Sequence, residues 1–300
     1  MTIGTREFII PGLQVPRSSI SWLERQRLLA SAGAATADGF DGVLQTVALG
    51  AEAVMDASFI DRIVDSSESW PVSGVYVVAA HPDDQPIVTD PIWLTNLMLL
   101  VAGFRLSGKR VVLGYANQQQ LLCGCAAVDT ICSGTWLNVR AFGIDKFYET
   151  EEADPRQRGQ WCYSALALSE YRAASIQVAA RTGALDLLVP RSGGYQTLRE
   201  LVDAGQFASI TERELFRHYL ITLAEQASAV ARGTFAETVE SLRGMLSTAE
   251  DTISELRASA IRPSYRALSG AAIDASVTAL DLFEREAGPT MARAWGALTA

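Results

Sequence analysis

Lysine and histidine are both scarce in this chain of 300 residues, and each scarcity excludes a class of chemistry. The two histidines, His81 and His218, cannot build a metal centre that needs several imidazoles. A Schiff-base mechanism is limited to the two lysines, Lys109 and Lys146. Lys109 precedes its predicted strand, which is the wrong end of a strand for the active site of a barrel. We therefore predict neither a metal nor a cofactor.

Cysteine is sparse as well, and its spacing disfavours a zinc site. The four cysteines form no Cys-x-x-Cys pair, and they stand at Cys123, Cys125, Cys132 and Cys162. Cys123 and Cys125 fall on one predicted helix, where residues i and i+2 face different directions. Structural thiols are therefore favoured over a metal site. No disulfide framework is evident, which is typical of a reducing compartment, and we predict a cytoplasmic protein.

Long hydrophobic runs are missing. The longest strongly apolar window, Ile92–Phe104, contains Asn96 and is too short to span a bilayer, so it indicates a buried helix. The N-terminal run Phe8–Pro11 is too short for the apolar region of a signal peptide. We expect no association with a membrane.

Positive charge is in deficit, since the formal net charge is −9 and the pI is about 4.9. A broad basic surface that binds nucleic acid is therefore disfavoured. Only a local basic groove is still compatible with nucleic-acid binding. The apolar fraction of 49% and the charged fraction of 20% allow a sizeable core and exclude global disorder.

The clearest fold signal lies between Lys109 and Arg140. Two short apolar runs, Val111–Leu113 and Thr130–Cys132, flank the helix-periodic segment Gln118–Val128. Strand, helix and strand in this order form a βαβ unit, whose strands are parallel and whose crossover is nearly always right-handed.

Further alternation precedes this unit. Gly42–Leu49 and Gly74–Ala80 are predicted strands, and Asp56–Ser66 and Ile92–Leu106 are predicted helices. The alternation predicts a parallel α/β sheet. Because only four or five strands can be counted, a partial or degenerate TIM barrel, or a small doubly wound sheet, fits better than a complete barrel.

The pattern changes after the sheet, and three parts are predicted. Residues 1–40 form an N-terminal arm and helix, 41–145 the parallel α/β core, and 146–300 a mostly helical region. Trp161–Leu188 is predicted as one long helix or two. The Ala/Leu/Glu/Arg-rich helices of 161–295 support an alternative function, a non-catalytic subunit that forms a homo-oligomer or binds a protein partner.

Polar residues follow the predicted strands, where parallel α/β folds collect their ligands. After Gly74–Ala80 come His81, Asp83 and Asp84, which are candidates for acid/base catalysis. The alternative is a turn whose carboxylates cap the next helix. A second group is predicted to bind a small polar ligand: Tyr115, Asn117, Ser133, Gly134, Thr135, Trp136 and Asn138.

This second group has structural alternatives too. Gly134 permits close backbone approach, so the amides around it could hold a phosphate or carboxylate, with Trp136 stacking on the ligand. Alternatively, Ser133–Trp136 is a strand-to-loop turn with Trp136 buried as a plug. Asn117 is also a good helix N-cap. The acidic run Glu149–Asp154 is predicted as a solvated loop, with a lid as the alternative.

The segment Cys123–Trp136, CGCAAVDTICSGTW, resembles the barrel core of the tRNA-guanine transglycosylase superfamily, which includes relatives that act on DNA. The similar strand-helix-strand rhythm runs from Val75 to Asn138. The resemblance implies a TIM-barrel-like fold and a ligand such as a nucleobase or nucleotide, with Asp83 or Asp84 as nucleophile or base. The family's Asp-Ser-Gly-Gly-Phe-Gln segment is absent, and no histidine follows Cys132 at the spacing of the family's zinc site. The resemblance therefore implies a degenerate transglycosylase-like enzyme.

Overall fold

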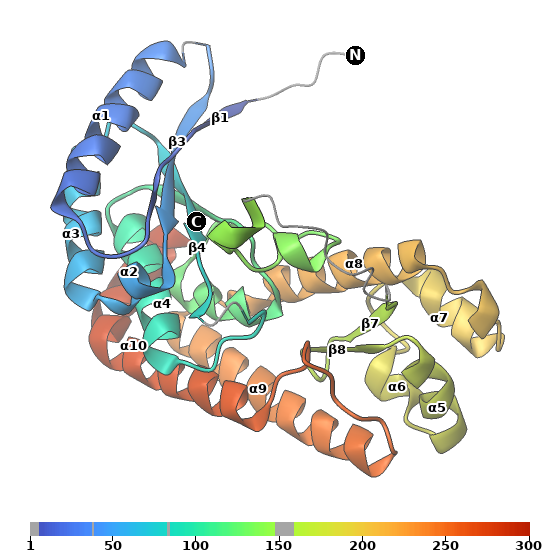
Figure 1. Cartoon of the computed structure of the whole chain (residues 1–300). Helices are drawn as coiled ribbons and strands as arrows, with labels where there is room; N and C mark the ends of the chain where they lie inside the picture. The colour runs from blue at the N-terminus through green and yellow to red at the C-terminus, as the bar shows by residue number, and fades with distance from the viewer. Residues whose placement is uncertain (1–5, 38, 83–84, 148–158) are drawn as a thin grey trace.

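The computed structural model describes residues 6–37, 39–82, 85–147 and 159–300, and it confirms a parallel α/β half followed by a mostly helical half (Figure 1). The sheet of the first half consists of β1 (Glu7–Ile10), β2 (Gln14–Val15), β3 (Gly42–Leu49), β4 (Gly74–Ala79), β5 (Arg110–Leu113) and β6 (Thr130–Ile131). Its order is β1-β3-β4-β5-β6, with β2 paired to β3 beyond the end of β1. Every pair is parallel.

The strand order follows the chain in one direction, as in a barrel. The connecting helices are α1 (Ile20–Thr36), α2 (Ala51–Met55), α3 (Ala57–Ser67), α4 (Pro91–Leu106) and the 3-10 helix η2 (Gln118–Ala126). Figure 1 shows α1, α3 and α4 on the same side of the sheet. A doubly wound sheet reverses its order and carries helices on both faces. The described strands therefore form an open, barrel-like sheet that ends at β6.

The two faces of the sheet differ because side chains alternate along each strand. Val47, Val75 and Val111 point to the helices and are fully buried. The opposite, inner face carries Thr46 and Tyr76, which are only half-buried. One side of this parallel sheet is thus covered by helices, and the other is covered only in part.

An ion pair crosses the inner face at the amino-terminal ends of the strands. Glu7 of β1 binds Arg110 of β5, although β3 and β4 lie between them. Two glycines of the intervening strands, Gly42 and Gly74, leave room for the side chains of this ion pair. A Cβ at Gly42 would lie 3.4 Å from Glu7 Cγ, and a Cβ at Gly74 would lie 2.9 Å from Arg110 Cβ.

The helical half begins with a structure that the sequence analysis missed. Its elements are β7 (Trp161–Ser164), β8 (Ser169–Arg172), α5 (Ala174–Thr182), α6 (Leu185–Leu188), α7 (Gln196–Asp203), α8 (Glu212–Val230), α9 (Phe235–Ala258) and α10 (Gly270–Leu298). The helix predicted to begin at Trp161 is wrong, because β7 and β8 form an antiparallel hairpin. Cys162 pairs with Tyr171 across it, and both are fully buried. Aromatic residues at alternate positions favour strands, and here this preference prevails over the helical spacing.

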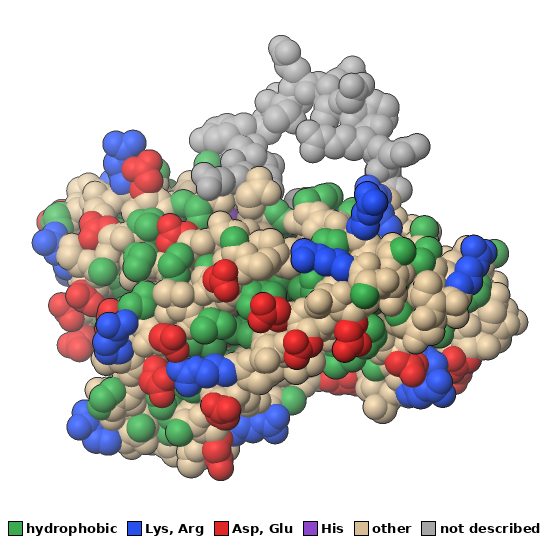
Figure 2. All heavy atoms as spheres, turned by 90° about the horizontal axis from the view of Figure 1, so that it is seen from below, with side chains coloured by type: hydrophobic (Ala, Val, Ile, Leu, Met, Phe, Trp, Pro, Cys, Tyr) green, Lys and Arg blue, Asp and Glu red, His purple; other side chains and the backbone are tan. Residues whose placement is uncertain are grey.

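The long helices form a further layer on the helix-covered side. α10 packs on α4, and α9 packs on α10 (Figure 1). Arg243 of α9 pairs with Asp281 and Glu284 of α10, each at 2.7 Å. Figure 2 shows such charges interspersed with apolar side chains on this face of the molecule. Within the described ranges, no helix has the length and apolar character needed to cross a bilayer.

α8 packs closely on η2 at a glycine, Gly124. A Cβ at Gly124 of η2 would lie 2.2 Å from Cγ1 of Val230 at the end of α8. The absence of a side chain therefore sets how closely α8 packs on η2. Farther along α8, His218 is 1% exposed, and its Nε2 lies 2.9 Å from the carbonyl oxygen of Tyr163.

Burial lowers the pKa of His218 below its ordinary value of 6.5, although the Tyr163 carbonyl opposes the shift. Below about pH 6.5 the unfolded chain therefore takes up a proton that the folded chain does not. The unfolding free energy should therefore decrease as the pH is lowered below this value. His218→Gln should flatten this dependence. Urea unfolding between pH 8 and pH 5 should show a smaller loss of unfolding free energy in the variant. The same pH dependence of the unfolding free energy in the wild type and in His218→Gln would contradict a lowered pKa of His218.

Candidate functional site

The predicted catalytic group lies at the carboxyl end of β4. His81 is 4% exposed, and its Nδ1 lies 2.9 Å from the carbonyl oxygen of Gln85. Its ring meets the edge of Trp93 with 5.3 Å between the centroids. Asp83 and Asp84 lie outside the described residues, as does the acidic run Glu149–Asp154. Catalysis by His81, Asp83 and Asp84 therefore stays a prediction.

Asn117 has the capping role that was its structural alternative. Its Oδ1 accepts the N–H of Gln119 at 2.8 Å, and Gln120 completes a capping box at the start of η2. Its Nδ2 donates to the carbonyls of Pro86 and Arg140 at 2.7 and 3.1 Å. Asn117 is 2% exposed, and these bonds occupy its donors and its oxygen in the fold.

The loop after β6 surrounds Arg140, which the sequence analysis did not single out. Arg140 Nε donates to the carbonyl of Gly134 at 2.6 Å, and Nη2 donates to that of Thr135 at 3.0 Å. Nη1 lies 2.8 Å from a carboxylate oxygen of Glu170, and the guanidinium carbon lies 3.5 Å from the ring centre of Tyr219. The loop thus directs two carbonyls at a buried cation.

The remaining predicted ligand residues point in different directions. Tyr115 packs its ring against Phe142, an inner-face contact with 5.2 Å between centroids. Trp136 is 50% exposed and meets Phe216 of α8, so the alternative of a buried plug is wrong. The side chain of Asn138 lies outside the described residues. Ser133 points to the helical side.

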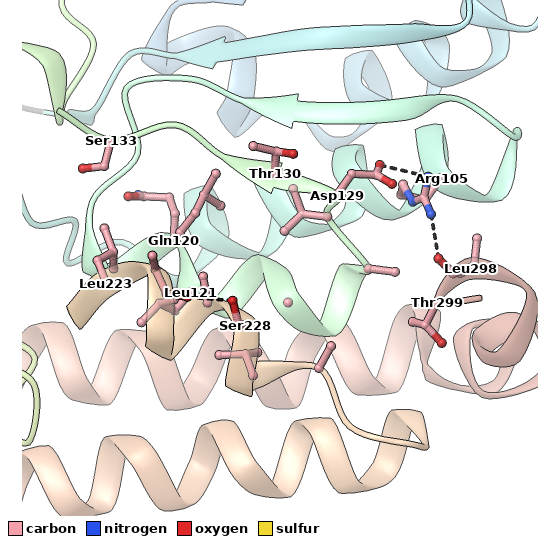
Figure 3. A pocket seen from close by; sticks show the side chains of 18 of the residues that line it. Arg105, Gln120, Leu121, Asp129, Thr130, Ser133, Leu223, Ser228, Leu298 and Thr299 are labelled. Atoms are coloured by element: carbon pink, nitrogen blue, oxygen red, sulfur yellow. Dashed lines mark hydrogen bonds and ion pairs between the residues drawn. The ribbon is translucent and has the colours of Figure 1, made fainter. Parts of the chain in front are cut away.

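Ser133 lines a pocket of about 730 Å³ between β6, η2, α8 and the end of α10 (Figure 3). This volume lies within the ordinary range for small-molecule sites. The walls are mostly aliphatic and include Leu121, Leu220, Leu223, Ala224, Ala227 and Val230. Among the described lining residues there is no aromatic side chain.

The edge of β6 forms part of the pocket wall. Thr130 and Ile131 both line the pocket, although consecutive strand residues point to opposite faces, so the main chain itself is presented. The N–H of Cys132 donates to the carbonyl of Leu113 on β5 at 2.7 Å. In a parallel ladder, the residue before this donor directs its own N–H and C=O to the other side. The amide and carbonyl of Ile131 therefore face away from β5.

The two ends of the pocket are polar in different ways. At one end Arg105 pairs with Asp129 at 2.9 Å and also donates to the carbonyl of Leu298 at 2.7 Å, so its charge is balanced. At the other end Ser133 Oγ lies 3.1 Å from the hydroxyl of Tyr219. Burial raises the pKa of Tyr219 to about 12, so this hydroxyl keeps its proton at neutral pH.

Gln120 also lines the pocket, and its amide is incompletely used. Its Oε1 accepts the N–H of Asn117 at 2.8 Å, but its buried Nε2 has no acceptor among the described groups. A buried donor without a partner costs about 1–3 kcal/mol. The sequence signal for Gln120 was its capping-box spacing from Asn117, and this signal points to structure and not to a ligand.

The cysteines do not add chemistry at this site. Cys123 and Cys125 are buried in η2, and burial raises the pKa of Cys123 to about 12. Cys132 lies next to Ser133 and is half-buried, and burial also raises its pKa. In the described part of the chain, no three His, Cys, Asp or Glu side chains form a group suited to a metal ion.

These observations define an α/β protein with an open parallel sheet, a helical second half and a pocket at the sheet edge. Comparison with models of protein families, with curated proteins and with solved structures gives no match to this chain.

The buried ion pair yields a stability prediction. The side chains of Arg140 and Glu170 are 2% and 5% exposed, and Arg266 lies 3.5 Å from the same carboxylate. Glu170→Gln should lower the unfolding free energy by about 3–5 kcal/mol, because buried guanidinium charge loses its counter-ion. Urea denaturation at pH 7 measures this change.

The exposed pair Arg17–Glu52, with side chains 77% and 70% exposed, offers a matched control. Glu52→Gln should change the unfolding free energy by less than about 1 kcal/mol. Equal effects of the two substitutions would show that the Arg140–Glu170 pair has no special weight.

Proposed function

We propose that the protein binds a small molecule in the pocket between β6, η2 and α8. The observation that carries the proposal is that the outward main chain of Ile131 is unpaired in a mostly aliphatic wall. Two lining residues, Gln120 and Arg105, also have a buried nitrogen without a partner among the described groups, Nε2 and Nε respectively. Such groups lose free energy when they are withdrawn from water without a partner. A ligand that offers a hydrogen-bonding edge would recover this loss and bury its remaining surface against α8.

The pocket favours an uncharged ligand with an apolar body. The charge of Arg105 is balanced by Asp129, so an anion would have to displace a carboxylate at 2.9 Å. Leu220, Leu223 and Ala227 offer dispersion contacts but no ring for stacking. A nucleobase, which the sequence resemblance implies, would lack an aromatic partner among the described lining residues. We therefore propose a ligand that is more apolar than a nucleobase.

Binding is the activity proposed, because His81 is not among the residues that line this pocket. The polar edge of the ligand would face β6, and its body would face the small residues of α8. Ala224 and Ala227 have small side chains and leave the pocket open on the side of α8. A larger side chain there should therefore fill the space that the ligand occupies.

Ala227→Trp should abolish binding by filling the pocket, whereas Ala229→Trp, on an exposed position of the same helix outside the pocket, should not. Native mass spectrometry of the three purified proteins, followed by thermal shifts with a set of uncharged bicyclic compounds, measures this difference. We expect a bound mass or a raised Tm in the wild type and Ala229→Trp alone. Equal binding by Ala227→Trp, or no binding by the wild type, would contradict the proposal.

A further inference from the structure

We infer that the pocket recognises a cyclic secondary amide, whose N–H and C=O pair with the main chain of Ile131. This inference rests on the proposed function and names the chemistry of the ligand edge. The starting point is the edge of β6, where one residue directs a donor and an acceptor to the same side. Outside the sheet, no described group hydrogen-bonds to the main chain of Ile131.

The shape of an amide decides which ligand can satisfy both groups at once. In an open-chain amide the trans geometry places the N–H and C=O on opposite sides. In a small ring the amide is held cis, so its donor and acceptor lie side by side on one edge. Among secondary amides, only the cyclic form can therefore donate to the Ile131 carbonyl and accept from the Ile131 amide with a single group.

Gln120 extends the same preference. Nε2 of Gln120 has no acceptor among the described groups, and a carbonyl oxygen has two lone pairs. In Figure 3 Gln120 projects from η2 on the β6 side of the pocket, near Ser133. A ring carbonyl bound to the Ile131 amide would leave one lone pair for a donor at this end of the pocket.

An added β-strand from another protein is a poorer occupant of the same edge. β6 has two residues, Thr130 and Ile131, and only the second directs its main chain outward. A partner strand would therefore gain few ladder bonds. The space beside β6 is also limited by α8 and by the end of α10, which form the other walls of the pocket.

The probe is quinolin-2-one, a cyclic amide on an apolar bicycle, and its matched control is N-methylquinolin-2-one, in which a methyl group replaces the donor hydrogen. Titrations of the 300-residue chain are followed through the backbone amide signal of Ile131 in nitrogen-15 NMR spectra. We expect quinolin-2-one to shift this signal and to bind about tenfold more tightly than its N-methyl form, the usual weight of one hydrogen bond. Ala227→Trp should remove the binding.

A variant tests the Ile131 donor directly. Proline lacks the N–H, and it is tolerated at an edge strand where that group faces outward. Ile131→Pro should therefore keep the β5–β6 ladder and lose affinity for quinolin-2-one by about tenfold, whereas Ile131→Val should keep both. Retained affinity in a folded Ile131→Pro variant would overturn the inference.

The outcomes separate this inference from the proposed function. Equal binding of both quinolinones to the wild type, abolished by Ala227→Trp, would overturn the cyclic-amide edge but leave the pocket as a binding site. Binding of quinolin-2-one that survives in Ala227→Trp would place it elsewhere and overturn the inference. The inference would also be overturned if neither quinolinone bound, and native mass spectrometry would still decide whether the pocket holds another ligand.

Discussion

A buried guanidinium, that of Arg140, joins three segments that lie far apart in the sequence. It donates to the carbonyls of the loop after β6, pairs with Glu170 on β8 and lies against the ring of Tyr219 on α8. A charge at this depth is tolerated only when its partners are held in place, so each segment depends on the others. The hairpin and α8 are thereby fixed relative to the end of the sheet.

The pocket follows from this arrangement. Tyr219 is held beside Ser133, and the glycine at position 124 sets how closely Val230 approaches η2. α8 is therefore anchored at both of these points and lines the pocket between them with small side chains such as Ala227. An open sheet edge is ordinarily a site of unwanted association, and here the edge is short and enclosed by helices. The same enclosure makes it suitable for a small ligand.

Local periodicity in the sequence predicted the central strands of the sheet, whereas β1 and β2, which also belong to it, lie in the segment 1–40 that was predicted as an arm and helix outside the core. The apolar runs at β3, β4 and β5 and the amphipathic spacing of α3 identified the parallel half correctly, because these signals are contained in single segments. The β7–β8 hairpin was missed because helical spacing also fits its residues. The pocket was not predictable in this way, since its walls come from segments near residues 105, 120, 131, 225 and 298. Arg140 was overlooked because an arginine in a loop after a strand gives no sign that it will be buried.

The position of the pocket also follows from where the sheet stops. In a closed barrel the outward amide and carbonyl of Ile131 would pair with the next strand, and ligands would collect only at the carboxyl ends of the strands. In this chain the next strands, β7 and β8, pair with each other, and in the described part of the chain no strand continues the sheet beyond β6. The hydrogen-bonding groups that a further strand would have used are left facing a pocket. The edge of the sheet at β6 is therefore a place where unpaired main-chain groups and an open volume coincide.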